Sequence, residues 1–169
     1  MSSVVLGIDP GIARTGFGVI EADERGFKHL RHDIIFTESG LPTGSRLLYI
    51  YEAIIDVVRA FSPVLVGIES LYFAKNISSA FPVAHARGVI LLAMAQEGIP
   101  AMEFPPQEIK MAITGNGRAN KAQVQELVRF LLGLSEQPEP DHAADALAAA
   151  ICCYNSSRGV AGLEPTKAR

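Results

Sequence analysis

The chain has 169 residues, of which 49% are hydrophobic and 20% are charged, so it is too apolar to be disordered and long enough for one domain. Its formal net charge of −3 is unlike the basic charge of most nucleic-acid-binding domains, but it does not exclude one, because such binding needs a basic face and not a basic mean. No apolar run approaches the ~18 residues of a membrane helix, and the only two cysteines, Cys152 and Cys153, are adjacent, which argues against a disulfide framework, so we expect a soluble, cytoplasmic protein with no membrane partner.

The first third of the chain predicts an antiparallel β-meander. Residues 4–8 are a mostly β-branched run that suits a buried strand, and residues 15–21 and 27–37 carry further apolar positions. Polar turns at residues 9–11 and 23–26 separate the three runs. Short links between consecutive strands are typical of a meander.

A helix and a buried strand follow the meander. Between residues 45 and 61, apolar residues recur at three- and four-residue spacing, which predicts an amphipathic helix that Pro63 ends. Residues 64–69 repeat the character of the first strand and also finish on an acid, Glu69.

The second half of the chain alternates helices with one more strand. A helix is predicted through residues 84–96, with Ser78 or Ser79 as its N-cap. Pro82 fits only the first turn of a helix because it lacks an N–H, so this helix should start close to it. The remaining elements are a strand at residues 101–104, a short helix at 105–110, a helix from Asn120 to Leu132 and an alanine-rich helix at 141–154.

The order of these elements predicts the fold class. Asn120 and Gln123 form a variant of the capping box, which supports a helix start at this point. After Ser156 the chain turns to Gly, Pro and charge, so we expect one domain over residues 1–156 and a flexible tail over residues 157–169. A meander followed by alternating helices and strands predicts an α/β domain, in which a mixed sheet of antiparallel and parallel strands carries helices on both faces.

Three acids stand out by their positions in these elements. Asp9 ends the first strand, Glu69 ends the fourth, and Asp145 lies in the last helix, one turn after Asp141 and His142. Equivalent ends of adjacent parallel strands lie together, and residues i and i+3 or i+4 share a helix face. Converging carboxylates are the ligands that Mg²⁺ and Mn²⁺ prefer, and two such ions can activate a water and stabilise the leaving oxygen of a phosphodiester.

Each of these residues also has an ordinary structural explanation. Asp9 alone could be a turn former, Asp141 is best explained as a helix N-cap, and His142 could be a surface residue of the first turn. Asp145, however, is a charge among alanines and needs a partner if it is buried, and Glu69 has no turn to form. Taken together, the acids favour a metal site.

Several motifs along the chain resemble the RuvC family of Holliday-junction resolvases. The matching residues are Gly7-Ile8-Asp9-Pro10-Gly11, Thr15-Gly16-Phe17-Gly18, Ile68-Glu69, Phe73-Ala74-Lys75-Asn76, Ala86-Arg87-Gly88, Lys110, Thr114-Gly115-Asn116-Gly117, Ala119-Asn120-Lys121 and Ala143-Ala144-Asp145-Ala146-Leu147-Ala148. The resemblance implies an RNase H-like nuclease domain over residues 1–156, a homodimer, and metal-dependent nicking of two opposed strands of a four-way DNA junction in recombination and repair. It also implies the RuvA–RuvB branch-migration complex as a partner.

The resemblance assigns the catalytic residues position by position. Asp9, Glu69 and Asp145 take the acidic roles that bind Mg²⁺ or Mn²⁺, with two ions in each active site. Many members have an aspartate three residues before the last acid, where this chain has His142, and an acid stands one place earlier at Asp141. We favour His142 as the fourth catalytic ligand because it keeps the register, with Asp141 as the alternative. Imidazole suits Mn²⁺ better than Mg²⁺, so we expect faster cleavage with Mn²⁺.

The middle of the chain is its only basic part. Residues 71–130 carry a net charge of +2, whereas residues 1–70 and 131–169 carry −3 and −2. Basic side chains contact phosphates, and an aromatic ring can stack on an unpaired base. The residues that we expect to contact DNA are Tyr72, Lys75, Lys110, Arg118 and Lys121. The resemblance supports this expectation at Tyr72, Lys110 and Lys121, and the alternative is ordinary solvated lysines with an aromatic in the core.

Two other functions fit part of the pattern. The turn from Asp9 to Gly11, followed by Thr15-Gly16, resembles the phosphate loop of actin-like and sugar-kinase folds, but a phosphotransferase of that kind needs a second lobe. A non-catalytic junction-binding module would be favoured only if the acids were missing. The preferred function is hydrolysis of phosphodiesters by metal-activated water, which leaves 5′-phosphate and 3′-hydroxyl ends.

Overall fold

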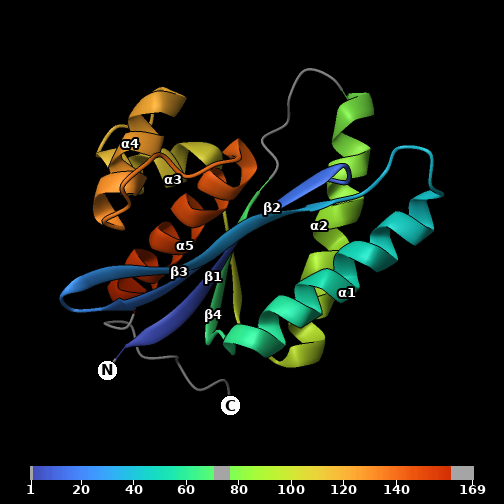
Figure 1. Ribbon diagram of the computed structural model, residues 1–169, viewed down its shortest axis with the longest axis horizontal. Coiled ribbons are helices and arrows are strands. Elements are labelled where there is room, and N and C mark those ends of the chain that lie inside the picture. The colour runs from blue at the N-terminus through green and yellow to red at the C-terminus, as the bar shows by residue number, and fades with distance from the viewer. Residues whose placement is uncertain (1, 71–76, 161–169) are drawn as a thin grey trace, which may run out of the picture.

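Five strands form one mixed β-sheet in the order β3-β2-β1-β4-β5. The computed structural model describes residues 2–70 and 77–160 (Figure 1). The strands are β1 (Ser3–Asp9), β2 (Arg14–Asp23), β3 (Gly26–Phe36), β4 (Leu65–Glu69) and β5 (Ala101–Phe104). β1, β2 and β3 pair in antiparallel fashion, whereas β4 runs parallel to β1 and β5 runs parallel to β4.

Helices cover both faces of this sheet (Figure 1). They are α1 (Thr43–Phe61), α2 (Ile77–Glu97), α3 (Pro106–Thr114), α4 (Lys121–Leu131) and α5 (Asp141–Val160). α1 and α2 pack on one face, and α5 lies on the other with α3 and α4 outside it. The predicted mixed sheet with helices on both faces is confirmed.

α5 lies directly against the backbone of the central strands. A Cβ atom at Gly7 of β1 would come within 1.9 Å of the Ala146 carbonyl oxygen, and one at Gly16 of β2 would come within 2.0 Å of the His142 carbonyl oxygen. Because any side chain at these two positions would push the helix away, the strands carry glycine where α5 crosses them. The small alanine side chains of α5 complete this close contact.

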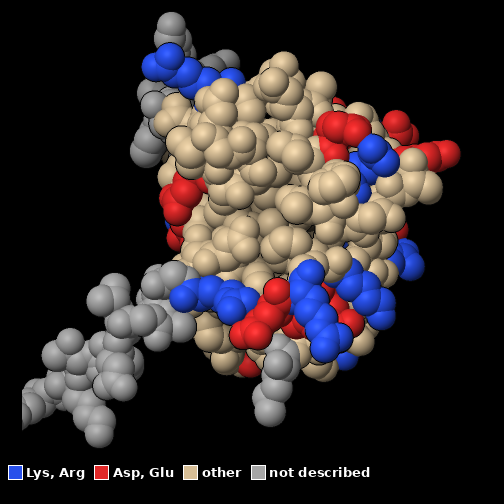
Figure 2. Space-filling view, turned by 90° about the vertical axis from the view of Figure 1, so that its left-hand side faces the viewer, with Lys and Arg blue, Asp and Glu red and all other residues tan. Residues whose placement is uncertain are grey.

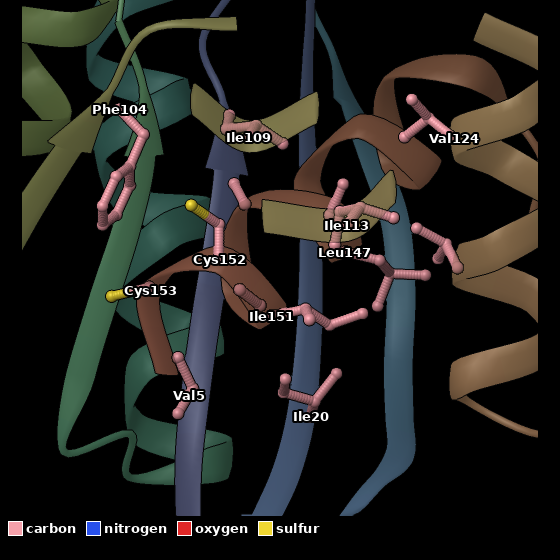
Figure 3. Packing of buried hydrophobic residues seen from close by; sticks show 14 of the residues in the cluster. Val5, Ile20, Phe104, Ile109, Ile113, Val124, Leu147, Ile151, Cys152 and Cys153 are labelled. Carbon is pink, nitrogen blue, oxygen red and sulfur yellow. The ribbon is translucent and has the colours of Figure 1, made fainter. Parts of the chain in front are cut away.

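A buried apolar layer joins α5 to α3 and α4 (Figure 3). Leu147 and Ile151 of α5 are fully buried in it. The neighbouring helices contribute Ile109, Ile113, Val124 and Val128. Cys152 and Cys153 are also buried in this layer, and both are free thiols.

The predicted start of α2 is wrong, and α3 continues to Thr114, past its predicted end at residue 110. α2 begins at Ile77, so Ser78 and Ser79 lie inside the helix, and Pro82 is its sixth residue rather than part of the first turn. Pro82 therefore costs the helix one backbone hydrogen bond, which the burial of Ala86 and Ile90 of the same helix outweighs.

The last helix is longer than the sequence predicted. α5 continues to Val160, past the expected end at residue 154 and past the expected start of the tail at residue 157. Arg158 supports these last turns, because its guanidinium lies 5.9 Å from the centre of the Tyr154 ring and 3.3 Å from the Glu24 carboxylate. Residues 161–169 lie outside the described residues, and the domain boundary at residue 156 stays a prediction.

The capping box that was predicted at Asn120 is confirmed. The Asn120 side chain accepts a hydrogen bond from the Gln123 backbone N–H at 2.9 Å, and the Gln123 side chain accepts one from the Asn120 N–H at 2.9 Å. This cap fixes the start of α4 and therefore the place of Lys121, its first residue. In the described parts of the chain, no helix is long and apolar enough to cross a membrane.

Candidate active site

Asp9 and Glu69 lie side by side at the carboxyl ends of β1 and β4. The residues before them are paired in parallel register, so the two acids occupy equivalent positions on neighbouring strands. Side chains alternate along a strand, and Asp9 and Glu69 follow two residues after Gly7 and Gly67, whose open sides face α5. Both carboxylates therefore lie on the α5 side of the sheet.

The first turns of α5 bring His142 and Asp145 to the same edge. His142 Nδ1 lies 2.6 Å from Asp9 Oδ2, which joins the helix to β1. The backbone of His142 rests on Gly16, so the height of the imidazole above the sheet is set by the contact between helix and strand. Asp145 lies one turn further on and faces the same side of the helix.

Lys121 connects α4 to two acids of α5. Its Nζ lies 3.2 Å from Asp145 Oδ2 and 3.1 Å from Asp141 Oδ2. The other oxygen of Asp141 accepts a hydrogen bond from Gln125 Nε2 at 3.0 Å. Within the described residues, Asp141 is therefore engaged by α4 and does not act as the predicted N-cap, whereas His142 contacts Asp9.

Burial and mutual repulsion change the proton affinity of the acids. Burial raises the pKa of Glu69 to about 8, and the negative charges of Asp9 and Asp145 add to this rise. Burial also raises the pKa of Asp9, although the hydrogen bond from His142 opposes it. Burial lowers the pKa of Lys121, but its hydrogen bonds to Asp141 and Asp145 outweigh this and the net pKa is raised. The ionised forms of Asp9 and Glu69 are therefore unfavourable as they stand, and a nearby cation would stabilise them.

The donor types at this edge fit a divalent cation. Three carboxylates and one imidazole are suitable ligands for Mg²⁺ or Mn²⁺, with the imidazole favouring Mn²⁺. As the side chains stand, no three His, Cys, Asp or Glu residues of the described chain are close enough together to hold an ion. The Lys121 ammonium supplies positive charge beside Asp145 instead.

Two of the lysines that were predicted to contact DNA line a cavity with the acids. This cavity of about 210 Å³ is lined by Glu69, Asp145, Lys110 and Lys121, with an apolar wall from α3, α4 and α5. Positive and negative groups therefore meet in one small space, where the lysines can contact a phosphate and the acids can act on it.

The other predicted DNA contacts lie elsewhere. Arg118 is exposed in the loop between α3 and α4, where its backbone N–H donates to Asn116 Oδ1, and it lines a separate hollow. Tyr72 and Lys75 lie outside the described residues. On the face shown in Figure 2, charged side chains of both signs lie around the rim and uncharged residues cover the middle, so no broad basic field covers that face.

Sequence reasoning missed the residues that hold the turn after Asp9. Thr37 is one of two buried polar residues in the described chain; its hydroxyl donates to the Ile12 carbonyl and accepts from Arg46 Nε at 2.9 Å. Its backbone N–H donates to the Ala13 carbonyl at 3.1 Å. A threonine after an apolar strand carries no distinctive signal in a single sequence, so this support could be found only in three dimensions.

Comparison with known proteins decides the family. A family model described as crossover junction endodeoxyribonuclease RuvC matches residues 5–153. This chain belongs to the RuvC family. A crossover junction endodeoxyribonuclease RuvC from Treponema denticola is 50% identical over 151 residues, which cover 89% of this chain and 85% of that relative.

Solved structures agree with this assignment. Thermus thermophilus RuvC matches with a TM-score of 0.86 at 34% identity, over 92% of this chain and 96% of that chain. T. thermophilus RuvC in complex with a Holliday junction substrate matches with a TM-score of 0.85 at 32% identity, over 92% and 96% of the two chains. The predicted RNase H-like RuvC fold and crossover junction endodeoxyribonuclease activity are confirmed, which decides against the phosphotransferase and the non-catalytic module.

Proposed function

We propose that this RuvC-family chain binds four-way DNA junctions and hydrolyses one phosphodiester in each of two opposed strands, leaving 5′-phosphate and 3′-hydroxyl ends. The contact between Asp9 on β1 and His142 on α5 carries the proposal, because it joins two catalytic candidates at the edge where Glu69 and Asp145 also lie. The T. thermophilus RuvC complex with a Holliday junction supports the choice of substrate.

The acids supply the metal ligands in this proposal. Asp9, Glu69 and Asp145, with His142 as the fourth ligand, would hold two Mg²⁺ or Mn²⁺ ions. When bound, such ions would supply activation of the attacking water and stabilisation of the leaving oxygen. The raised pKa values of Asp9 and Glu69 support the proposal, because carboxylates forced together gain most from a cation.

The imidazole and the lysines act on the proton and the phosphate. Asp9 engages His142 at Nδ1, so Nε2 is the atom that would bind the metal or take a proton from the attacking water. Lys121 and Lys110 line the cavity beside Glu69 and would contact the scissile or neighbouring phosphate. Lys121 must then leave Asp145 and move toward the DNA.

An exposed stripe on α2, which is apolar at Phe81 and Leu92, supports a homodimer. Phe81, His85, Gly88 and Leu92 are exposed, and their spacing of four, three and four residues places them on one side of the helix. Nothing lies within 4 Å of a Cβ built at Gly88, so another helix could approach closely there. A two-fold dimer would match the symmetry of the junction, with one nick made by each protomer. The RuvA–RuvB complex is proposed as a partner from the resemblance alone, and the cytoplasmic location is proposed from the sequence features given above.

A nicking assay on a synthetic four-way junction tests the proposal. The wild-type chain with Mn²⁺ or Mg²⁺ should release paired, symmetric nicks, whereas linear duplex of the same sequence should stay intact. Asp9→Asn should bind the junction and leave it uncut. Nicking by Asp9→Asn, or equal nicking of the linear duplex, would contradict the proposed site and substrate.

A further inference from the structure

His29 and His32 share one face of the edge strand β3 because of a β-bulge. The pairing with β2 shifts between Val19 and Ile20, which leaves Leu30 opposite no residue. Residues three apart on a regular strand point to opposite faces. The extra residue reverses this alternation and places both imidazoles on the face that carries α5.

The two imidazoles already direct ring nitrogens at each other. His29 Nε2 lies 2.7 Å from His32 Nδ1, and the ring centres are 4.8 Å apart at an interplanar angle of 64°. Burial lowers the pKa of His29, and the charge of His32 lowers it further. The neutral form, which is the form that binds metals, is therefore favoured.

A hollow beside His32 offers further ligands. It has a volume of about 450 Å³ and is lined by His32 and by the loop from Leu134 to Glu139, which joins α4 to α5. Glu136 and Glu139 are two acids of that loop, and both are exposed. Two imidazoles and a carboxylate are a ligand set that suits Zn²⁺ and similar ions.

We propose that His29 and His32 bind a divalent ion of the zinc class at a second site, separate from the acids of the candidate active site. Each imidazole would keep its single proton on the outer nitrogen, His29 Nδ1 or His32 Nε2, and give the lone pair of the facing nitrogen to the ion. Tetrahedral coordination needs the facing nitrogens roughly 3.3 Å apart, so the pair must open by about 0.6 Å.

The loop completes the site. In the described chain no third ligating side chain already stands at the pair, so Glu136 or Glu139 must turn inward, with water in the remaining position. The bound ion would tie β3 to the loop that directly precedes α5. It would thereby stiffen the segment that leads into His142.

The chain contains four histidines, which allows a sharp test by calorimetry. We would titrate ZnCl₂ into the His142→Gln variant, which lacks the imidazole of the candidate active site. Excess Mg²⁺ would be present to occupy the acids of that site. This variant should bind one Zn²⁺ per chain. Adding His29→Gln or His32→Gln should weaken Zn²⁺ binding at least ~10-fold. Mutation of a residue that only supports a metal ligand already costs about 10–100-fold in affinity, and a ligand should cost no less. Adding His85→Gln, the matched control on α2, should not.

Either of two results would overturn the proposal. One is Zn²⁺ affinity that is unchanged by His29→Gln and His32→Gln, and the other is affinity that is lost only with His85→Gln. If a variant does not fold, the wild-type chain answers the question by NMR. Zn²⁺ should then shift the ring-proton signals of His29 and His32 together, and shifts confined to His85 and His142 would contradict the site. Neither measurement depends on DNA cleavage.

Discussion

At the scale of single residues, His142 and Asp141 are neighbours with different surroundings. His142 contacts the half-buried Asp9, whereas Asp141 faces Lys121 and Gln125 at the protein surface. In the proposed site, a group beside the metal ligands would act on the reaction, while a group that only holds Lys121 would act through that lysine. The two side chains should therefore contribute unequally to cleavage.

We expect His142→Ala to slow single-turnover junction cleavage by about 100-fold or more, the lower range for losing a proton-transfer group or ligand. Asp141→Ala should slow it much less, because Lys121 keeps Asp145 as a partner. Both variants should be compared at saturating Mn²⁺, with junction binding measured separately. Equal losses would return Asp141 to consideration as the fourth ligand.

The metal preference should follow the residue at position 142. The wild-type chain is expected to cleave faster with Mn²⁺ than with Mg²⁺, because an imidazole is a softer ligand than a carboxylate. His142→Asp should keep activity and move the preference toward Mg²⁺. The ratio of the two rates at matched saturation measures this. A ratio that is the same in both proteins would exclude His142 as a ligand.

Cys152 and Cys153 should react only slowly with alkylating reagents in the folded protein. Burial raises the pKa of Cys152 to about 11 and that of Cys153 to about 12, so fewer thiolates exist at any given pH. Both residues are also fully shielded, with 0% of their surface exposed. We expect iodoacetamide at pH 8 to modify the native chain at least ~100-fold more slowly than the chain in denaturant. Equal rates, measured by mass spectrometry, would contradict this burial.

At the scale of elements, the contact between α5 and the strand glycines should tolerate substitution least. Gly7→Ala would place a Cβ 1.9 Å from the Ala146 carbonyl oxygen, so the helix must move or the strand must bend. Such overpacking should cost about 3 kcal/mol, which corresponds to a fall of roughly 6–12 °C in Tm for a chain of this size.

Gly44→Ala is the matched control for this prediction. Gly44 lies in α1 with nothing within 4 Å of the added Cβ, so alanine should leave the stability unchanged or raise it by up to about 1 kcal/mol. Thermal unfolding followed by circular dichroism compares the two variants. Similar Tm values would show that α5 is not held as closely as the structure shows.

Helix and strand ends can be predicted from the sequence where neighbouring residues fix them, but not where packing between distant segments does. The start of α4 was predictable because Asn120 and Gln123 bond to each other's backbone within one turn. The start of α2 was not, since the packing of its buried face outweighs the unfavourable Pro82. Asp9 and Glu69 were predictable from their strand ends, but the partner of Asp141 depends on how α4 packs against α5.

At the scale of the whole molecule, the acidic average charge does not describe the part that is proposed to face DNA. Lys110 and Lys121 share a cavity with Glu69 and Asp145, so groups of both signs lie together at the candidate active site. Metal binding would neutralise the acids and leave the lysines as the net charge. Junction affinity should therefore rise with divalent ion, apart from any effect on cleavage.

The homodimer can be tested at the α2 stripe. Leu92 is 55% exposed on that stripe, and Leu92→Glu would place a charge between the protomers. We expect this variant to sediment as a monomer and to lose the coupling between paired nicks. Phe130→Glu is the matched control, because Phe130 is 73% exposed on α4, away from the stripe. Dissociation caused by Phe130→Glu alone would move the interface to α4.

The close contact of α5 with Gly7 and Gly16 limits which substitutions can change the candidate site. At Gly7 and Gly16 the helix rests on peptide groups, so the gap between Asp9 on the strand and His142 on the helix is set by backbone dimensions. Swaps among core side chains change volumes elsewhere but insert no atoms into that gap. The core or the loops could therefore be redesigned, and the spacing within the candidate site would be retained without further changes.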